Sequence, residues 1–95
     1  MKYKDDWDRV YKMVLITNDN MYRMESHNRP DFEDMRKLVG GYVTQTMGTF
    51  EGKEVWILVD EDGLDKDLPT NHMASACSHQ MLVGDALILV NFELE

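Results

Sequence analysis

Residues 31–42 read DFEDMRKLVGGY, and this stretch decides the fold because it holds one complete helix and its exit. Asp31 can cap the first amides, while acidic residues in the first turn and basic residues in the last turn suit the helix dipole. Apolar residues at spacings of three and four share one face; they are Phe32, Met35, Leu38 and Val39. The pattern predicts an amphipathic helix over Asp31–Val39 that ends at Gly40 in a left-handed C-cap.

Strands are predicted on both sides of this helix. Apolar or alternating runs bounded by turn residues predict strands at 10–17, 21–25, 42–50, 54–60 and 86–92. The run Val55–Val59 is apolar throughout, which is typical of a strand covered on both faces or central in a sheet. Residues 72–80 predict a second, short helix. The order predicts an α+β fold: a single, mostly antiparallel sheet of four to five strands with the main helix packed on one face.

Length and charge limit the classes of function. The 95 residues suffice for a single domain, 1–95, in which 1–9 are expected to be a frayed end or a lead-in pinned by Trp7. Leu94 and Glu95 can be a remnant of a cloning tag. The formal net charge of −8 disfavours binding to nucleic acid, keeps the protein soluble and would suit a basic partner.

Other features of composition point to the cytoplasm. The chain has one cysteine, Cys77, so no internal disulfide is possible. No apolar run approaches the length of about 20 residues that spans a bilayer, and residues 1–6 lack the apolar core of a signal peptide. We therefore expect a cytoplasmic protein that does not bind membranes.

Methionine is abundant, with eight residues in the chain. We expect most of these side chains to fill the core between the sheet and the helices, because the flexible thioether packs into irregular gaps. The methionines expected there are Met13, Met35, Met47, Met73 and Met81. The alternative is a methionine-rich groove for a partner.

The succession of short motifs resembles a family of small domains of unknown function, DUF3846, found in bacteria, phages and mobile elements. The resemblance runs from about Tyr11 to Val90 and is carried by four segments: LVGGYV at 38–43, LVDEDG at 58–63, LPTN at 68–71 and VGDALILV at 83–90. Thr44 stands where an acidic residue is common, and the loop Asp60–Asp67 is richer in acidic residues. The resemblance implies a fold and a phage or mobile-element origin, and it carries no assigned chemistry.

Several kinds of site are disfavoured by spacing. Gly40 and Gly41 lie at the negative end of a helix, whereas phosphate sites use the positive end. The acidic loop carries Asp60, Glu61, Asp62, Asp65 and Asp67, but its glycine and acids do not match a calcium-binding loop. This loop is interpreted as solvated, with a weak, adventitious cation site or a patch for a basic partner as the alternatives. His72, Cys77 and His79 lack the paired spacing of a zinc site, and side chains two apart on a helix diverge. No metal, cofactor or catalytic group is predicted.

Two functions of different class remain. The first is a non-catalytic protein-binding or regulatory module that acts on a host protein through an acidic face or a strand edge; a DNA mimic is a variant of it. The second is a site for a nucleotide-like small molecule between the Gly40–Tyr42 turn and the Leu68–His72 segment. Its candidate ligand-binding residues are Tyr42, Thr70, Asn71 and His72. Asn71 is interpreted first as a helix cap. The oligomeric state stays open.

Overall fold

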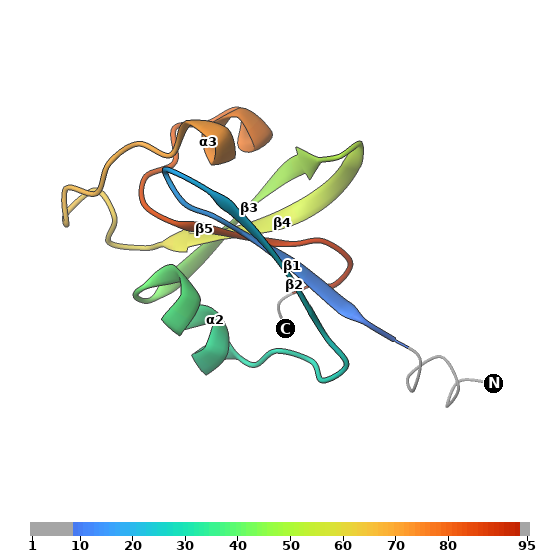
Figure 1. Cartoon of the computed structure of the whole chain (residues 1–95). Helices are drawn as coiled ribbons and strands as arrows, with labels where there is room; N and C mark the ends of the chain where they lie inside the picture. The colour runs from blue at the N-terminus through green and yellow to red at the C-terminus, as the bar shows by residue number, and fades with distance from the viewer. Residues whose placement is uncertain (1–8, 94–95) are drawn as a thin grey trace.

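In the computed structural model, which describes residues 9–93, one five-stranded antiparallel sheet carries a helix on each face (Figure 1). The strands are β1 (Tyr11–Ile16), β2 (Met21–Ser26), β3 (Val43–Phe50), β4 (Lys53–Asp60) and β5 (Ala86–Leu89). Their order across the sheet is β2-β1-β5-β4-β3, so the last strand of the chain lies at the centre and β2 and β3 form the edges. The predicted α+β class is confirmed, with five strands in the sheet.

Helix α2 (Phe32–Val39) has the capping that its sequence predicts. The Asp31 carboxylate accepts a hydrogen bond of 2.9 Å from the Asp34 amide, and Asp31 is the N-cap. Gly40 ends the helix at a φ of 98°, and its amide donates to the Arg36 carbonyl at 2.7 Å. A left-handed residue of this kind costs least when it is glycine.

Helix α3 (His72–Ser78) is shorter than the predicted range of 72–80. Its N-cap is Asn71, as the sequence predicts, and His79 takes a left-handed conformation with a φ of 58°. The chain therefore turns out of the helix before Gln80. In Figure 1 this helix lies on the opposite side of the sheet from α2, a placement that the local sequence pattern could not supply.

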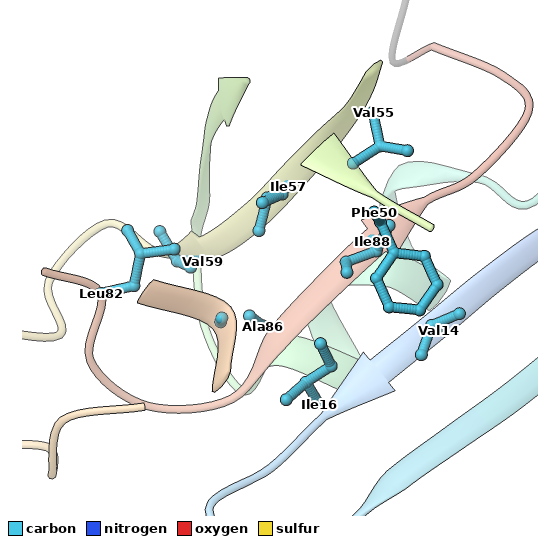
Figure 2. Close-up of a cluster of buried hydrophobic side chains, with 10 residues drawn as sticks. Val14, Ile16, Phe50, Val55, Ile57, Val59, Leu82, Ala86 and Ile88 are labelled. Atoms are coloured by element: carbon cyan, nitrogen blue, oxygen red, sulfur yellow. The ribbon is translucent and has the colours of Figure 1, made fainter. Parts of the chain in front are cut away.

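The core is divided into two apolar clusters by the sheet. One lies on the α3 face and is drawn in Figure 2; its buried residues are Val14, Ile16, Phe50, Val55, Ile57, Val59, Ala74, Leu82, Ala86 and Ile88. The other lies on the α2 face and is built from Met13, Met35, Val39, Leu58, Leu87, Leu89 and Phe92. Strand β4 contributes to both clusters by its alternation, which confirms the strand covered on both faces that its apolar run predicts.

Strand β5 ends at Leu89, three residues before the predicted end. The Val90 amide still donates to the Lys12 carbonyl at 2.9 Å, but the Asn91 side chain then replaces backbone pairing. Asn91 Oδ1 accepts from the Lys12 amide at 3.0 Å, and Asn91 Nδ2 donates to the Val10 carbonyl at 2.7 Å. The segments 1–8 and 94–95, with Trp7 and the tag remnant, lie outside the described residues.

The prediction that methionines fill the core is right for two of the five that it names. Met13 and Met35 are buried, at 7% and 3% exposure. Met47, Met73 and Met81 are exposed at 48%, 46% and 65%. Met47 lies outside the core because β3 is an edge strand. The position of a strand in the sheet depends on pairing between distant segments, so the local sequence could not predict it.

Candidate functional site

The predicted ligand-binding residues fall into two separate hollows. Tyr42 lines a hollow at the end of α2 together with Gly41, Asp62 and Lys66. The residues Thr70, Asn71 and His72 line another hollow, beside Thr17 and Asn18. Helices α2 and α3 pack on opposite faces of the sheet. The structure thus brings Tyr42 together with the acidic loop and does not bring it together with the LPTN segment.

Asn71 is fully buried, and its side chain is occupied by the protein itself. Its amide group donates to the Ile16 and Gly84 carbonyls, each at 2.9 Å. Its carbonyl oxygen accepts from the Ala74 amide at 3.1 Å. These three bonds join the end of β1, the segment before β5 and the start of α3. Asn71 is therefore a helix cap that also links three segments of the chain, and its side-chain amide has no donor left to bind a ligand.

An ion pair lies beneath the glycine turn on the other face. Asp60, at the end of β4, has a side chain only 2% exposed, and its Oδ2 lies 2.6 Å from Lys66 Nζ. Its Oδ1 accepts from the Asp62 amide at 2.8 Å. A Cβ on Gly41 would lie 2.8 Å from both Asp60 Oδ2 and Lys66 Nζ. A side chain at position 41 would therefore press on this ion pair and displace it.

The pair changes the ionisation of both groups. Burial would raise the pKa of Asp60, but the hydrogen bonds from Lys66 and the Asp62 amide outweigh it and the pKa is lowered. The hydrogen bond to Asp60 raises the pKa of Lys66. Both groups are charged at neutral pH. The Asp60 carboxylate is occupied by its bonds to Lys66 and the Asp62 amide, which anchor the loop.

The other acids of the loop face the solvent. Glu61, Asp62, Asp65 and Asp67 are exposed, and the loop that carries them joins β4 to the LPTN segment. No group of three or more metal-binding side chains occurs in residues 9–93. The loop thus presents an acidic surface at the start of β3, where the Glu61 amide donates to the Tyr42 carbonyl at 2.8 Å.

Tyr42 is 60% exposed and borders this acidic surface. The Arg36 guanidinium stacks on its ring, 4.2 Å from the centroid. Arg36 also bonds Glu33 at 3.1 Å. One face of the ring is therefore covered by a cation, and the hollow beside it has a volume of about 450 Å³.

The outer edge of β3 is a surface that local sequence patterns could not locate. A two-residue turn, Glu51–Gly52, with φ values of 52° and 81°, joins β3 to β4 and pairs Phe50 with Lys53. In an antiparallel pair, hydrogen-bonded residues alternate with residues that point away. Phe50, next to the turn, and Tyr42, which accepts from the Glu61 amide, are both even-numbered residues bonded toward β4. The even-numbered residues of β3 therefore bond to β4.

The odd-numbered residues of β3 direct their backbone groups outward. These residues are Val43, Gln45, Met47 and Thr49. Within residues 9–93, β3 pairs with β4 alone, so this edge is a row of free donors and acceptors. The eight residues from Val43 to Phe50 contain no charged side chain and no proline. This absence of charge can be read from the sequence. It indicates an unprotected edge only once β3 is known to lie at the edge of the sheet.

An open groove lies beside the edge, on the α2 face. Its volume is about 730 Å³, and its lining includes Met47, Trp56 and Phe92. Met47 pairs directly with Trp56 across β3 and β4. Arg9 and Arg29 also border the groove and donate to the carbonyls of Asn91 and Glu93, respectively. The two arginines thus hold the C-terminal segment in place.

Neither helix in the described part of the chain is long and apolar enough to cross a membrane.

Comparisons with known proteins identify a family for the chain. No curated protein and no solved structure matches the chain. Residues 11–93 match the family model described as "Domain of unknown function (DUF3846)", and the chain therefore belongs to this family.

Proposed function

We propose that the protein is a non-catalytic protein-binding module of the cytoplasm, and that β3 is its docking strand. The observation that carries the proposal is the outer edge of β3, which is eight residues long, uncharged and unpaired within residues 9–93. Many recognition domains bind an extended segment of a partner by adding it to such an edge. Main-chain hydrogen bonds then supply affinity and alternate side chains supply selectivity.

The edge is held in the shape that a partner strand needs. Gln80 Nε2 donates to Thr46 Oγ1 at 2.6 Å, which ties the segment after α3 to the middle of β3. The turn Glu51–Gly52 fixes one end, and the bond from Glu61 to Tyr42 fixes the other. A preorganised edge loses little conformational entropy when a partner binds. These contacts favour a β3 that is already ordered before a partner binds, rather than a strand that becomes ordered only in the complex.

The family resemblance extends the proposal to the origin of the partner. A phage or mobile-element protein of this kind acts on a protein of its host, in the host cytoplasm. The four exposed acids of the loop lie at the start of the docking strand and favour a basic partner. The acidic loop therefore adjoins one end of the strand edge.

A photo-crosslinking experiment in host lysate tests the proposal. A photoreactive amino acid replaces Thr49 on β3 in one protein and Tyr22 on β2 in another; both side chains are exposed. Each is combined with a proline at an outward-facing position of the same edge, Gln45→Pro on β3 or Glu25→Pro on β2. Proline removes an outward donor without breaking the ladder inside the sheet.

The expected result is a crosslinked partner at Thr49 that disappears with Gln45→Pro and persists with Glu25→Pro. Circular dichroism and thermal melting must show that both proline variants keep the fold. A partner captured equally from both edges, or one unaffected by Gln45→Pro, would refute β3 as the docking strand.

Binding of a nucleotide-like small molecule is the second candidate. The observation in its favour is the exposed Tyr42 ring, which lines the same hollow as Arg36, Lys37 and Lys66. A ligand there would stack on Tyr42 and pair its anionic group with a cation. A thermal-shift screen of nucleotides tests it: a ligand should raise the melting temperature of the wild type and not of Tyr42→Ala. Equal shifts in both proteins would exclude this hollow.

A further inference from the structure

We infer that the partner strand runs antiparallel to β3 and carries lysine or arginine just after an uncharged core. This inference rests on the proposed function and names the chemistry and the direction of the segment that β3 binds. Its basis is the unequal charge at the two ends of the edge.

The start of β3 carries a net negative charge. Arg36 and Lys66 are paired with Glu33 and Asp60, which leaves the exposed acids of the loop after β4 against Lys37. The loop that follows β4 begins beside the start of β3, on the β4 side, because the Glu61 amide bonds the Tyr42 carbonyl. Four acids of this loop are exposed: Glu61, Asp62, Asp65 and Asp67. The loop's cation, Lys66, is already engaged by the buried carboxylate of Asp60 at 2.6 Å. A partner that extends past Val43 therefore meets negative charge.

The other end of β3 is electrically balanced. Glu51, in the turn, pairs with Arg23 of β2 at 2.6 Å. Next to the turn, Lys53 and Glu54 carry opposite charges and are both exposed. A partner strand gains nothing there from basic residues, so the charge of the edge has a direction along β3.

Strand direction converts this asymmetry into a sequence order. In an antiparallel pair the partner's C-terminal end lies opposite the start of β3, whereas in a parallel pair its N-terminal end does. We assign the antiparallel arrangement because the whole sheet is antiparallel and antiparallel pairing is slightly more stable per residue. Basic residues therefore follow the core of the partner strand.

The middle of the edge sets the character of the core. Met47 points to the α2 face, is 48% exposed and stands beside Trp56. The residue opposite Met47 in the added strand projects to the same face, so a large apolar side chain there would cover this exposed surface. On the same face, the next positions of the added strand lie opposite Gln45 and Thr49, and suit small or β-branched residues.

A second copy of the chain fits the edge less well. Antiparallel self-pairing would set the balanced turn of one copy beside the acidic loop of the other and gain no charge attraction. Each chain carries a formal net charge of −8, so two copies repel each other before they meet. The asymmetry therefore favours a foreign, basic segment.

A titration with two synthetic peptides tests the inference. Both have the same core of about seven uncharged residues, rich in threonine and valine with one central leucine, matched to the length of β3. One carries three lysines after the core and the other carries them before it. Two-dimensional amide NMR follows binding to the complete protein, and the Gln45→Pro and Asp65→Asn/Asp67→Asn variants serve as comparisons.

The expected result is that both peptides shift the amides of Gln45 and Met47. The peptide with trailing lysines should bind about five- to tenfold more tightly at low salt, and about 0.5 M salt should remove the difference. The double asparagine variant should lose most of it, and Gln45→Pro should weaken both peptides alike.

Each other outcome has a definite meaning. Equal affinities, tighter binding of the peptide with leading lysines, or no binding of either peptide would overturn this inference and leave β3 to be judged by crosslinking. Binding that Gln45→Pro does not weaken would overturn the docking strand itself. A protein that light scattering shows to be dimeric through β3 would replace the foreign segment with a second copy.

Discussion

The two edges of the sheet are protected very differently. β2 carries Arg23 and Glu25 at positions whose backbone groups point outward, and Arg23 is further tied to Glu51. β3 has no charge along eight residues. Charged residues on an edge discourage pairing with other chains, and natural sheets commonly use them for this purpose. Within residues 9–93, one edge is therefore protected by charged side chains, and the other is uncharged and unpaired.

The largest expected effect on the free energy of unfolding distinguishes the residues of β3 that bond to β4 from those whose backbone groups point outward. Thr46→Pro should cost about 3 kcal/mol or more, because it removes a ladder donor to β4 and clashes in the sheet. Gln45→Pro should cost less than about 1 kcal/mol, because its amide points outward. Urea unfolding of both variants checks this. Similar losses for the two would mean that the assigned alternation along β3 is wrong.

A smaller effect is expected where β3 begins. Gly41→Ala should cost about 2 kcal/mol, because its methyl group would press on the Asp60–Lys66 ion pair. The control is Gly40→Ala, which meets no atom within 4 Å and is strained only by its left-handed φ. In double mutants with Asp60→Ala, the cost of Gly41→Ala should shrink while that of Gly40→Ala should stay. Full additivity for both would contradict the close contact.

Acid should weaken the same anchor. The folded pKa of Asp60 lies below its unfolded value of about 3.9, so its contribution is fully present above that pH and is lost as the pH falls through the folded pKa. Asp60→Asn should therefore be less stable than the wild type at pH 7, and the two should converge below about pH 4. Unfolding curves between pH 7 and pH 2 measure this, with Asp65→Asn as the control. A gap that stays constant with pH would contradict the ion-pair account.

The smallest effect on stability is expected at β2. Replacing Arg23 and Glu25 with threonine removes exposed charges, so the free energy of unfolding should hardly change. The protein should instead associate at high concentration, because a second edge is now open. Light scattering over a concentration series tests this. A variant that associates no more than the wild type would show that something other than charge closes β2.

Local sequence signals predicted part of this comparison well. Helix α2 was placed almost to the residue because Asp31, the charge gradient and Gly40 all act within a few residues of one another. The break between the strands predicted at 42–50 and 54–60 and the apolar character of β4 were also local signals. Asn71 was recognised as a cap, since capping depends only on its neighbours in the chain.

Long-range pairing accounts for what was missed. The order β2-β1-β5-β4-β3 places the last strand at the centre, and no local pattern says that β3 is therefore an edge. For the same reason, Met47 was expected in the core, and Tyr42 was expected near Thr70 and His72 although they line different hollows. The bonds from Asn71 to Ile16 and Gly84 span 55 and 13 residues and were invisible to local reasoning.

Amide hydrogen exchange of the free protein, followed by NMR along Val43–Phe50, tests the open edge most directly. The account predicts alternation: the amides of Gln45, Met47 and Thr49 exchange fast, while those of Thr46 and Gly48, bonded to β4, exchange slowly. Uniform slow exchange would mean that the edge is already covered, and would contradict the central claim.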